Sequence, residues 1–267
     1  MFQDKVIVIT GSAQGIGKRT AEMLAQRGAK VVINARRKEK VDETVLDFRA
    51  KGYQVFGAAG DVSDFAFCEQ LAKETIQHFG KIDYLINNAG LAAKGKLEET
   101  VPAVFEKLIS VNVLGSIYPS LAFLPHLKAS KGGILFISSL AGIVGLPSYL
   151  AYSCTKRSII SIAESLKNEL IDDQVFVGVN YPGFTENDSA KQNISPSGEV
   201  VTMKKRTDVK VESLDKTVAK IVQQLEKRKF SAYSSFQGRM VHIIYRLSPA
   251  LALTVVKKNR RKIMAMD

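Results

Sequence analysis

The sequence predicts one α/β domain, built on a doubly wound parallel sheet with helices on both faces and followed by a helical C-terminal extension. Short apolar runs alternate with longer mixed segments over the first 180 residues. The runs are continuous in Val, Ile and Leu, which is typical of strands buried on both faces. A chain of 267 residues with 46% hydrophobic residues is long enough to bury such a core.

Six strands and five helices are expected in alternation. The strands fall at residues 5–10, 30–35, 53–58, 82–87, 133–138 and 175–180. The helices fall at 16–27, 38–51, 64–79, 102–129 and 150–171. Strands joined through helices of this length are parallel, because each helix returns the chain to the same edge of the sheet.

A polar segment at 184–212 interrupts this alternation. It contains Pro196 and Gly198 and is too long for a routine connection. It is therefore either a lid over a substrate or a disordered insert. We favour the lid, because the segment follows the carboxyl end of a strand.

The stretch "TGSAQGIG" at 10–17 lies between the first strand and the first helix. Gly11, Gly15 and Gly17 allow a tight turn and a close approach of the backbone to a ligand. The helix start then offers unpaired N–H groups and the positive end of a dipole to a pyrophosphate. A glycine loop in this position predicts a dinucleotide site.

The end of the second strand indicates which dinucleotide. NAD sites usually place an acid there to accept a hydrogen bond from the ribose 2′-hydroxyl. Here Ala35 is followed by Arg36 and Arg37. The position therefore has no carboxylate that would repel a 2′-phosphate. A guanidinium can bind that phosphate with two hydrogen bonds. NADPH is therefore expected over NADH, unless both arginines only coat the next helix.

The glycine spacing G-x-x-x-G-x-G resembles that of the short-chain dehydrogenase/reductase family. Further matches follow in order: "NNAG" at 87–90, Asn112, "SS" at 138–139, Tyr152 with Lys156, and "PG" at 182–183. The resemblance covers about residues 5–183. It implies a Rossmann-type sheet and hydride transfer between a nicotinamide and a ketone or aldehyde.

The resemblance also implies a catalytic set of four residues: Asn112, Ser139, Tyr152 and Lys156. Tyr152 would donate the proton, since an ammonium one helical turn away favours the phenolate and lowers the pKa of a phenol. Lys156 would also hold the nicotinamide ribose. Ser139, rather than its neighbour Ser138, would donate a hydrogen bond to the substrate oxygen. Asn112 would anchor a water that relays protons to Lys156.

A larger set of residues is implied to contact the cofactor. Asp61 would bind the adenine amine, and Asn88 would be a scaffold asparagine. The full set is Gly11, Ser12, Gln14, Gly15, Ile16, Gly17, Arg36, Arg37, Asp61, Val62, Asn88, Ala89, Gly90, Tyr152, Lys156, Pro182, Gly183 and Thr185. Two positions depart from the family: Gln14 stands where NADP-preferring relatives often carry a base, and Asn187 stands where a threonine is usual. Thr185 and Ser189 are nearby substitutes for that threonine.

The positive charge is concentrated in the C-terminal quarter. Residues 1–203 hold 22 Lys and Arg against 21 Asp and Glu, whereas 204–267 hold 16 against 5. We divide the chain into a catalytic region, 1–236, and a basic, apolar extension, 237–267.

The stretch 240–256 is too short and too interrupted to span a membrane. Two short helices divided near Pro249 are expected. They either pack on the protein or a second subunit, or lie flat on an anionic membrane surface. Nucleic acid is a weaker alternative, since no basic platform with interleaved aromatics is visible.

The remaining features are expected to be structural. Cys68 and Cys154 do not suggest a disulfide framework, so a reducing, cytoplasmic location is expected, and the N-terminus shows no signal peptide. Cys154 is expected to be a small packed residue. The three histidines lack metal-ligand spacing, so no metal is expected.

The predicted function is NADPH-dependent reduction of a lipophilic or bulky carbonyl compound by a homodimer or homotetramer, with peripheral membrane attachment as one role for the extension. Two alternatives remain at this stage: a non-catalytic NADP(H) sensor, and a membrane- or nucleic-acid-binding module that uses the basic extension. The intact Ser–Tyr–Lys set argues against the sensor, which needs only the glycine loop.

Overall fold

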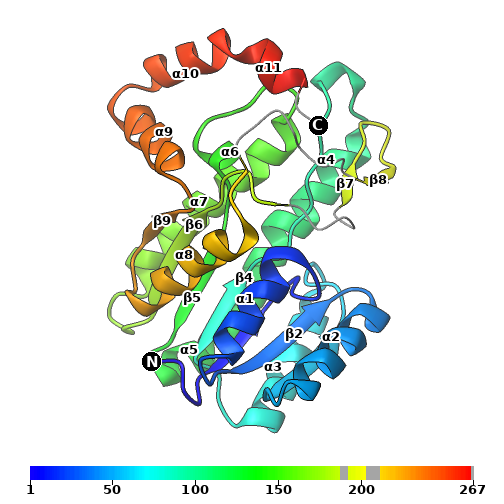
Figure 1. The fold of residues 1–267 in the computed structure, drawn as a ribbon, viewed down its shortest axis with the longest axis vertical. Helices are drawn as coiled ribbons and strands as arrows, with labels where there is room; N and C mark the ends of the chain where they lie inside the picture. Colours follow the sequence, from blue (N-terminus) through cyan, green and yellow to red (C-terminus); the bar gives the residue numbers. More distant parts are fainter. Residues whose placement is uncertain (187–191, 203–210, 266–267) are drawn as a thin grey trace.

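The computed structural model describes residues 1–186, 192–202 and 211–265 (Figure 1). Its centre is a seven-stranded sheet in the order β3-β2-β1-β4-β5-β6-β9, in which every neighbouring pair is parallel. The strand bounds are β1 Val6–Ile9, β2 Lys30–Ala35, β3 Val55–Ala59, β4 Tyr84–Asn87, β5 Gly133–Ile137, β6 Phe176–Tyr181 and β9 Ser231–Tyr233. The strand order reverses between β1 and β4, where sheets of this class open a crevice at their carboxyl ends.

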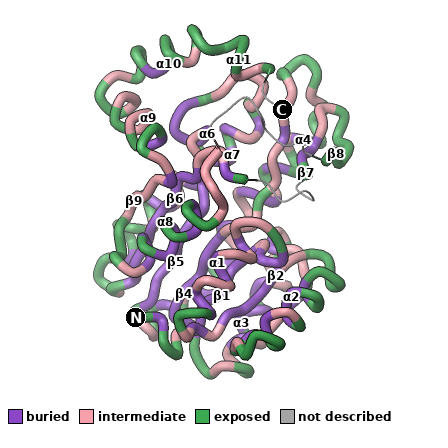
Figure 2. The backbone as a smooth tube through the Cα atoms, viewed as in Figure 1, coloured by how far each residue is buried: buried purple, intermediate pink, exposed green. Residues whose placement is uncertain are grey.

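Helices cover both faces of the sheet, as the continuous apolar strands require. One core contains buried residues of α1, α2 and α8, and the other contains those of α3, α5 and α7. The helix bounds in these layers are α1 Gly15–Ala25, α2 Lys38–Ala50, α3 Phe65–Phe79, α5 Gly115–Ser130, α7 Leu150–Glu169 and α8 Leu214–Glu226. The strands β1, β4, β5 and β6 lie fully buried between the two layers, whereas the edge strands β3 and β9 are partly exposed (Figure 2). The predicted doubly wound fold is therefore confirmed.

The predicted helix 102–129 is not a single regular helix. It consists of α4, Pro102–Leu108, a π-helical turn, Ile109–Leu114, and α5. The π turn contains Asn112 and inserts an extra residue into the helical repeat, as π turns at functional sites often do. This composite helix is also long and apolar enough to cross a membrane by composition, within the described residues. It packs against the sheet and α3 and is 44% buried in its most apolar window, so we assign it to the protein core.

The 13-residue helix α8 and several short elements escaped the sequence prediction. A seventh strand, β9, pairs with β6. Within 184–212, an antiparallel hairpin joins β7, Gln192–Ile194, to β8, Val200–Thr202, so the described part of this segment is ordered. A 3-10 turn, Leu97–Glu99, precedes α4, and a short helix α6, Leu140–Ile143, precedes α7.

The C-terminal extension contains three helices instead of the predicted two. They are α9 Phe236–Leu247, α10 Pro249–Lys258 and α11 Arg260–Ala265. The break between the first two falls at Ser248 and Pro249, as expected, because Ser248 caps α10 and Pro249 occupies its first turn. Figure 1 shows the three helices forming an arch at one end of the molecule.

Candidate active site

The predicted motifs all lie at the carboxyl edge of the sheet. The glycine loop follows β1, the two arginines follow β2, and Asp61 follows β3. Residues 88–90 follow β4, Ser138 and Ser139 follow β5, and Pro182 and Gly183 follow β6. Because the strands are parallel, these loops meet along one edge, at the point where the strand order reverses.

The three glycines of the loop are required for three different reasons. Gly11 has a φ of +63°, and a Cβ there would lie 2.8 Å from the Cα of Ala89. Gly15 has a φ of +54°, but a Cβ would meet nothing within 4 Å. Gly17 has no room for a side chain, because a Cβ would lie 2.5 Å from the Asn88 Nδ2. The open side of the loop is therefore at Gly15, at the start of α1.

Asn88 and Thr10 fix the glycine loop to the end of β4. The Asn88 Nδ2 donates hydrogen bonds to the carbonyl oxygens of Thr10 and Gly11, at 2.9 and 3.0 Å. The Thr10 hydroxyl oxygen accepts from the amides of Asn88 and Ala89, both at 3.0 Å. Asn88 thus occupies a scaffold position. Thr10 was missed by the sequence reasoning, although its place at the junction of strand and loop was a signal.

The Ser12 side chain lies inside the scaffold of the glycine loop. Its side chain is fully buried, and its hydroxyl donates to the Ile9 carbonyl at 2.6 Å and accepts from the Asn34 amide at 3.0 Å. The hydroxyl therefore joins β1 to β2 within the loop scaffold and does not face the crevice. Val62 is similarly buried, at 4% exposure, so its side chain belongs to the core.

The edge expected to bind the 2′-phosphate is positive and exposed. Arg36 and Arg37 are exposed, and neither pairs with a carboxylate in the described part of the chain. Asp61 lies nearby and accepts from the Ser63 amide and hydroxyl, at 2.9 and 2.7 Å. Partial burial acts to raise the pKa of Asp61. The Ser63 hydrogen bonds and the Arg36 and Lys107 charges outweigh it and hold this pKa below its usual range.

Lys156 is buried on the face of α7 that carries Tyr152. Its Nζ donates a 2.9 Å hydrogen bond to the Ile137 carbonyl of β5 and lies 5.8 Å from the centroid of the Tyr152 ring. A Cβ on Gly90 would lie 3.3 Å from this Nζ and 3.2 Å from the Asn112 Oδ1. The ammonium, the phenol ring, the Asn112 amide and the β4 loop therefore meet in one place.

The side chain of Asn112 is largely engaged with protein groups. Its Nδ2 donates to the Leu91 carbonyl and to the Thr155 hydroxyl, both at 2.9 Å, and its Oδ1 accepts from the Leu91 amide at 2.7 Å. Both N–H donors are thus used, and one lone pair of Oδ1 remains. A relay water bound by this side chain would have to donate to that oxygen.

The two adjacent serines have different surroundings. Ser138 is buried, and its hydroxyl donates to the Lys156 carbonyl at 2.8 Å, which ties β5 to α7. Ser139 is only half-buried, and its Oγ accepts from the Ala141 amide at 3.2 Å as the cap of α6. The Ser139 hydroxyl hydrogen is therefore available to an acceptor such as a carbonyl oxygen.

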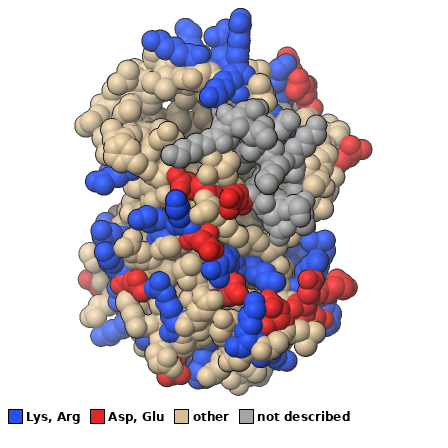
Figure 3. Space-filling view, viewed as in Figure 1, with Lys and Arg blue, Asp and Glu red and all other residues tan. Residues whose placement is uncertain are grey.

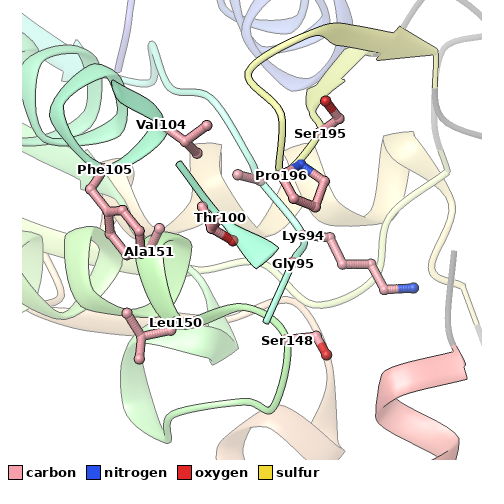
Figure 4. Close-up of a pocket in the computed structure, with 11 residues that line it drawn as sticks. Lys94, Gly95, Thr100, Val104, Phe105, Ser148, Leu150, Ala151, Ser195 and Pro196 are labelled. Carbon is pink, nitrogen blue, oxygen red and sulfur yellow. The ribbon is translucent and has the colours of Figure 1, made fainter. Parts of the chain in front are cut away.

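The hairpin of the 184–212 segment packs beside Tyr152. The Ile194 amide donates to the Ala92 carbonyl at 2.8 Å, and the Val101 amide donates to the Pro196 carbonyl at 3.0 Å. Figure 4 shows the resulting contact, which encloses a cavity of about 10 Å³, room for about one water. Its walls come from the loop 93–100, from residues 148–151 at the start of α7, and from the hairpin turn. The described part of the segment thus packs against the loop after β4 and the start of α7.

The substitute for the family threonine is not found among the described residues. The Thr185 hydroxyl is buried, shares a 3.1 Å hydrogen bond with the Thr217 hydroxyl of α8, and donates to the Gly183 carbonyl at 3.3 Å. This engagement argues against Thr185 as a side-chain ligand of the cofactor. Asn187 and Ser189 lie outside the described residues.

The prediction for Cys154 was wrong, because its side chain is exposed and not packed. Cys68 is buried in α3, and this burial raises the pKa of its thiol to about 12, which makes it unreactive at neutral pH. Among the described residues, no group of three or more His, Cys, Asp or Glu is placed to bind a metal.

Comparison with known proteins agrees with this geometry. The short chain dehydrogenase family matches residues 5–197, and the chain belongs to this family of oxidoreductases, which bind a nicotinamide cofactor. An uncharacterized oxidoreductase of Thermotoga maritima is 37% identical over 218 residues, which cover 80% of this chain and 86% of that protein.

Two further relatives carry names that refer to a substrate. The 3-ketodihydrosphingosine reductase of Bos taurus is 34% identical over 80% of this chain and 67% of its own length. The 11-beta-hydroxysteroid dehydrogenase-like 2 protein of Arabidopsis thaliana is 37% identical over 69% of this chain. The matched region covers only 60% of the length of the plant protein. Among solved structures, a short chain dehydrogenase/reductase of Burkholderia phymatum in complex with NAD superposes with a TM-score of 0.78. It is 25% identical, with 92% of this chain and 95% of that one covered.

Proposed function

We propose that the protein is an NADPH-dependent carbonyl reductase that acts on a lipophilic ketone or aldehyde. The observation that supports this most strongly is the meeting of Lys156, Tyr152 and the turn that begins at Ser139, beside an open glycine loop. A protein that only senses the cofactor would need the glycine loop alone. This site also has Tyr152 as a proton donor and Ser139 as a hydrogen-bond donor to the substrate carbonyl oxygen, which gains negative charge during hydride transfer.

The described residues fit a dinucleotide at this edge. The start of α1 has no side-chain cap and no acid in its first turn, so its N–H groups can meet a pyrophosphate. Ala35 leaves the end of β2 without a carboxylate, and Arg36 and Arg37 stand beside it, which favours a 2′-phosphate. When bound, the nicotinamide supplies the hydride.

The chain itself supplies orientation and the proton. Ser139 donates a hydrogen bond to the substrate carbonyl oxygen, and Tyr152 donates the proton that this oxygen needs as the hydride reaches its carbon. Lys156 stabilises the phenolate that remains and replenishes its proton through a water relay beside Asn112. General acid catalysis of this kind contributes about 10²- to 10⁴-fold in rate.

A lipophilic substrate is supported by two observations. The names of two relatives refer to a keto-sphingoid base, which carries a long alkyl chain, and to hydroxysteroids, which have a large apolar ring system. The C-terminal extension also exposes large apolar side chains, among them Leu247 at 82% and, on α10, Leu251 and Leu253, each at 53%. An enzyme with such a surface is suited to taking its substrate from a membrane.

The extension combines these apolar side chains with charge of one sign. Residues 236–265 contain seven Lys and Arg and no Asp or Glu, and five of the bases lie between 257 and 262. Figure 3 shows Lys and Arg gathered at the end of the molecule where α10 and α11 lie, and Figure 2 shows those helices largely exposed. Near an anionic bilayer each base contributes about 1 kcal/mol of binding free energy. We therefore place α10 and α11 on an anionic membrane surface.

Sedimentation with liposomes tests this placement. The protein should bind anionic vesicles at low salt, release them as salt rises, and ignore neutral vesicles. Neutralising the five bases of 257–262 with glutamine should abolish binding. A control that removes five exposed bases elsewhere should retain it, and those residues are Lys38, Lys40, Arg49, Lys73 and Lys220. If both variants lose vesicle binding equally, the net charge of the protein, and not the position of the bases on the extension, would explain the binding. Wild-type protein left in the supernatant would reject the placement.

A homodimer is expected to form through the outer face of α5. A groove of about 610 Å³ runs between α3 and α5, and Leu121 on its rim is 55% exposed. Leu121→Asp should therefore give a monomer in light scattering at tens of micromolar, whereas wild type should be dimeric or tetrameric. Leu46→Asp is the matched control, because Leu46 is 67% exposed on α2, which covers the opposite face of the sheet. A monomeric wild type would contradict the prediction.

A further inference from the structure

The guanidinium of Arg157 joins three elements around the catalytic residues. Arg157 directly follows Lys156 on α7. Its Nη1 donates to the carbonyl oxygens of Gly142, at 3.3 Å, and Ile143, at the end of α6. Its Nη2 donates to the Tyr245 hydroxyl of α9 at 2.8 Å, and its Cζ lies 4.7 Å from the centroid of that ring. One side chain therefore contacts α6 and α9 from α7.

The turn α6 begins directly after Ser139, which is its N-cap, and its carboxyl end needs hydrogen-bond donors from elsewhere. It is four residues long, so its carbonyl groups at Gly142 and Ile143 have no partners further along a helix. Arg157 supplies those partners with a positive charge, which is favourable at the carboxyl end of a helix. The turn is thus capped by Ser139 at one end and by Arg157 at the other.

The same turn packs tightly against both neighbouring helices. A Cβ on Gly142 would lie 2.6 Å from the Lys156 carbonyl oxygen of α7. A Cβ on Gly238 of α9 would lie 2.7 Å from the Leu140 Cδ2. Arg157 therefore contacts the carboxyl end of α6, the sides of α6 pack against α7 and α9, and Ser139 caps the opposite end of the same turn.

We propose that Arg157 is a positioning residue for Ser139 and that Tyr245 orients its guanidinium, so that α9 completes the active site. The first helix of the extension is in this view part of the catalytic unit, while α10 and α11 lie beyond it. The activity readout of this proposal rests on the proposed carbonyl reductase function. The placement of the turn can be measured without it.

Four variants test the proposal, with kcat and KM for a ketone substrate, the dissociation constant of NADPH, and hydrogen exchange of residues 139–146 as readouts. Arg157→Ala should lower kcat on the order of 10- to 100-fold, the loss expected when a catalytic group is misplaced. Exchange in 139–146 should become faster, while NADPH affinity stays unchanged, because the glycine loop is untouched. Arg157→Lys should recover little, since an ammonium lacks the fork that reaches both α6 and α9.

Tyr245→Phe keeps the ring and removes only the hydroxyl, so kcat should fall by about two- to tenfold. The double variant should be no slower than Arg157→Ala alone, because both changes act through one contact. Arg246→Ala is the matched control: Arg246 also joins α9 to α7, through an exposed 3.4 Å pair with Glu164, but does not touch α6. It should leave kcat and the exchange of 139–146 unchanged.

Unchanged exchange in 139–146 for both Arg157→Ala and Tyr245→Phe would overturn the proposal, whatever the activity. Equal losses in Arg157→Ala and Arg246→Ala would overturn it as well, since general docking of α9 would then explain them. Should Arg157→Ala not fold, Tyr245→Phe and Arg157→Lys decide in the same way. If exchange in 139–146 is faster in the Arg157 and Tyr245 variants but the wild type reduces no ketone, the positioning role of Arg157 would be supported and the carbonyl reductase function would be rejected.

Discussion

Tyr152→Phe is expected to lower kcat by about 10²- to 10⁴-fold, the contribution of a positioned general acid. The substitution keeps the ring that lies 5.8 Å from the Lys156 Nζ and removes only the hydroxyl. Cofactor affinity should therefore change little, because the glycine loop and Arg36 stay intact. Steady-state turnover of a ketone, together with NADPH binding followed by fluorescence, measures the two quantities separately.

Tyr53→Phe is the control for loss of a phenol, since Tyr53 packs against Phe48 and precedes the edge strand β3, away from Lys156. Its kcat should equal that of wild type. A Tyr152→Phe enzyme that keeps near-normal kcat would exclude Tyr152 as the acid. Loss of NADPH binding in that variant would assign the tyrosine to the cofactor site instead.

The second large effect concerns cofactor choice. Arg36→Ala is expected to raise the KM for NADPH on the order of tenfold and to leave the KM for NADH nearly unchanged. A charge-assisted hydrogen bond contributes about 1.5–3 kcal/mol, and solvent reduces this at an exposed side chain. Steady-state kinetics with each cofactor provide the comparison.

Ala35→Asp tests the same argument in the opposite direction. A carboxylate at the end of β2 would repel a 2′-phosphate and accept from a ribose 2′-hydroxyl, so the preference should move to NADH. Arg49→Ala is the matched control, because Arg49 is exposed at the far end of α2. Equal use of both cofactors by wild type would make the 2′-phosphate argument wrong.

The sheet was predictable because its strands carry their own signal. Six of its seven strands are apolar runs that only a doubly covered sheet can bury. The seventh, β9, reads "SAY" and is half-buried at the sheet edge, so it has no such run. The π turn at Asn112 was hidden because one extra residue hardly alters the pattern of an apolar helix.

The candidate site shows the same division. Gly11, Gly15 and Gly17 were found from spacing, since a short segment fixes a tight turn between strand and helix. The direction of the Ser12 hydroxyl could not be predicted from the sequence, because its partner Asn34 lies on the next strand. Arg157 gave no signal at all, since Tyr245 is 88 residues away. Residues that act through distant partners require the folded structure.

The most direct test of the central claim is transfer of deuterium from C4-deuterated NADPH to apolar ketones, with the alcohol product analysed by mass spectrometry. Wild-type enzyme should give a labelled alcohol, Tyr152→Phe should give far less of it, and C4-deuterated NADH should label the alcohol more slowly than C4-deuterated NADPH. The contradicting result is wild-type protein that binds NADPH but yields no more labelled alcohol than Tyr152→Phe from any ketone, whether steroid, long-chain or small and polar.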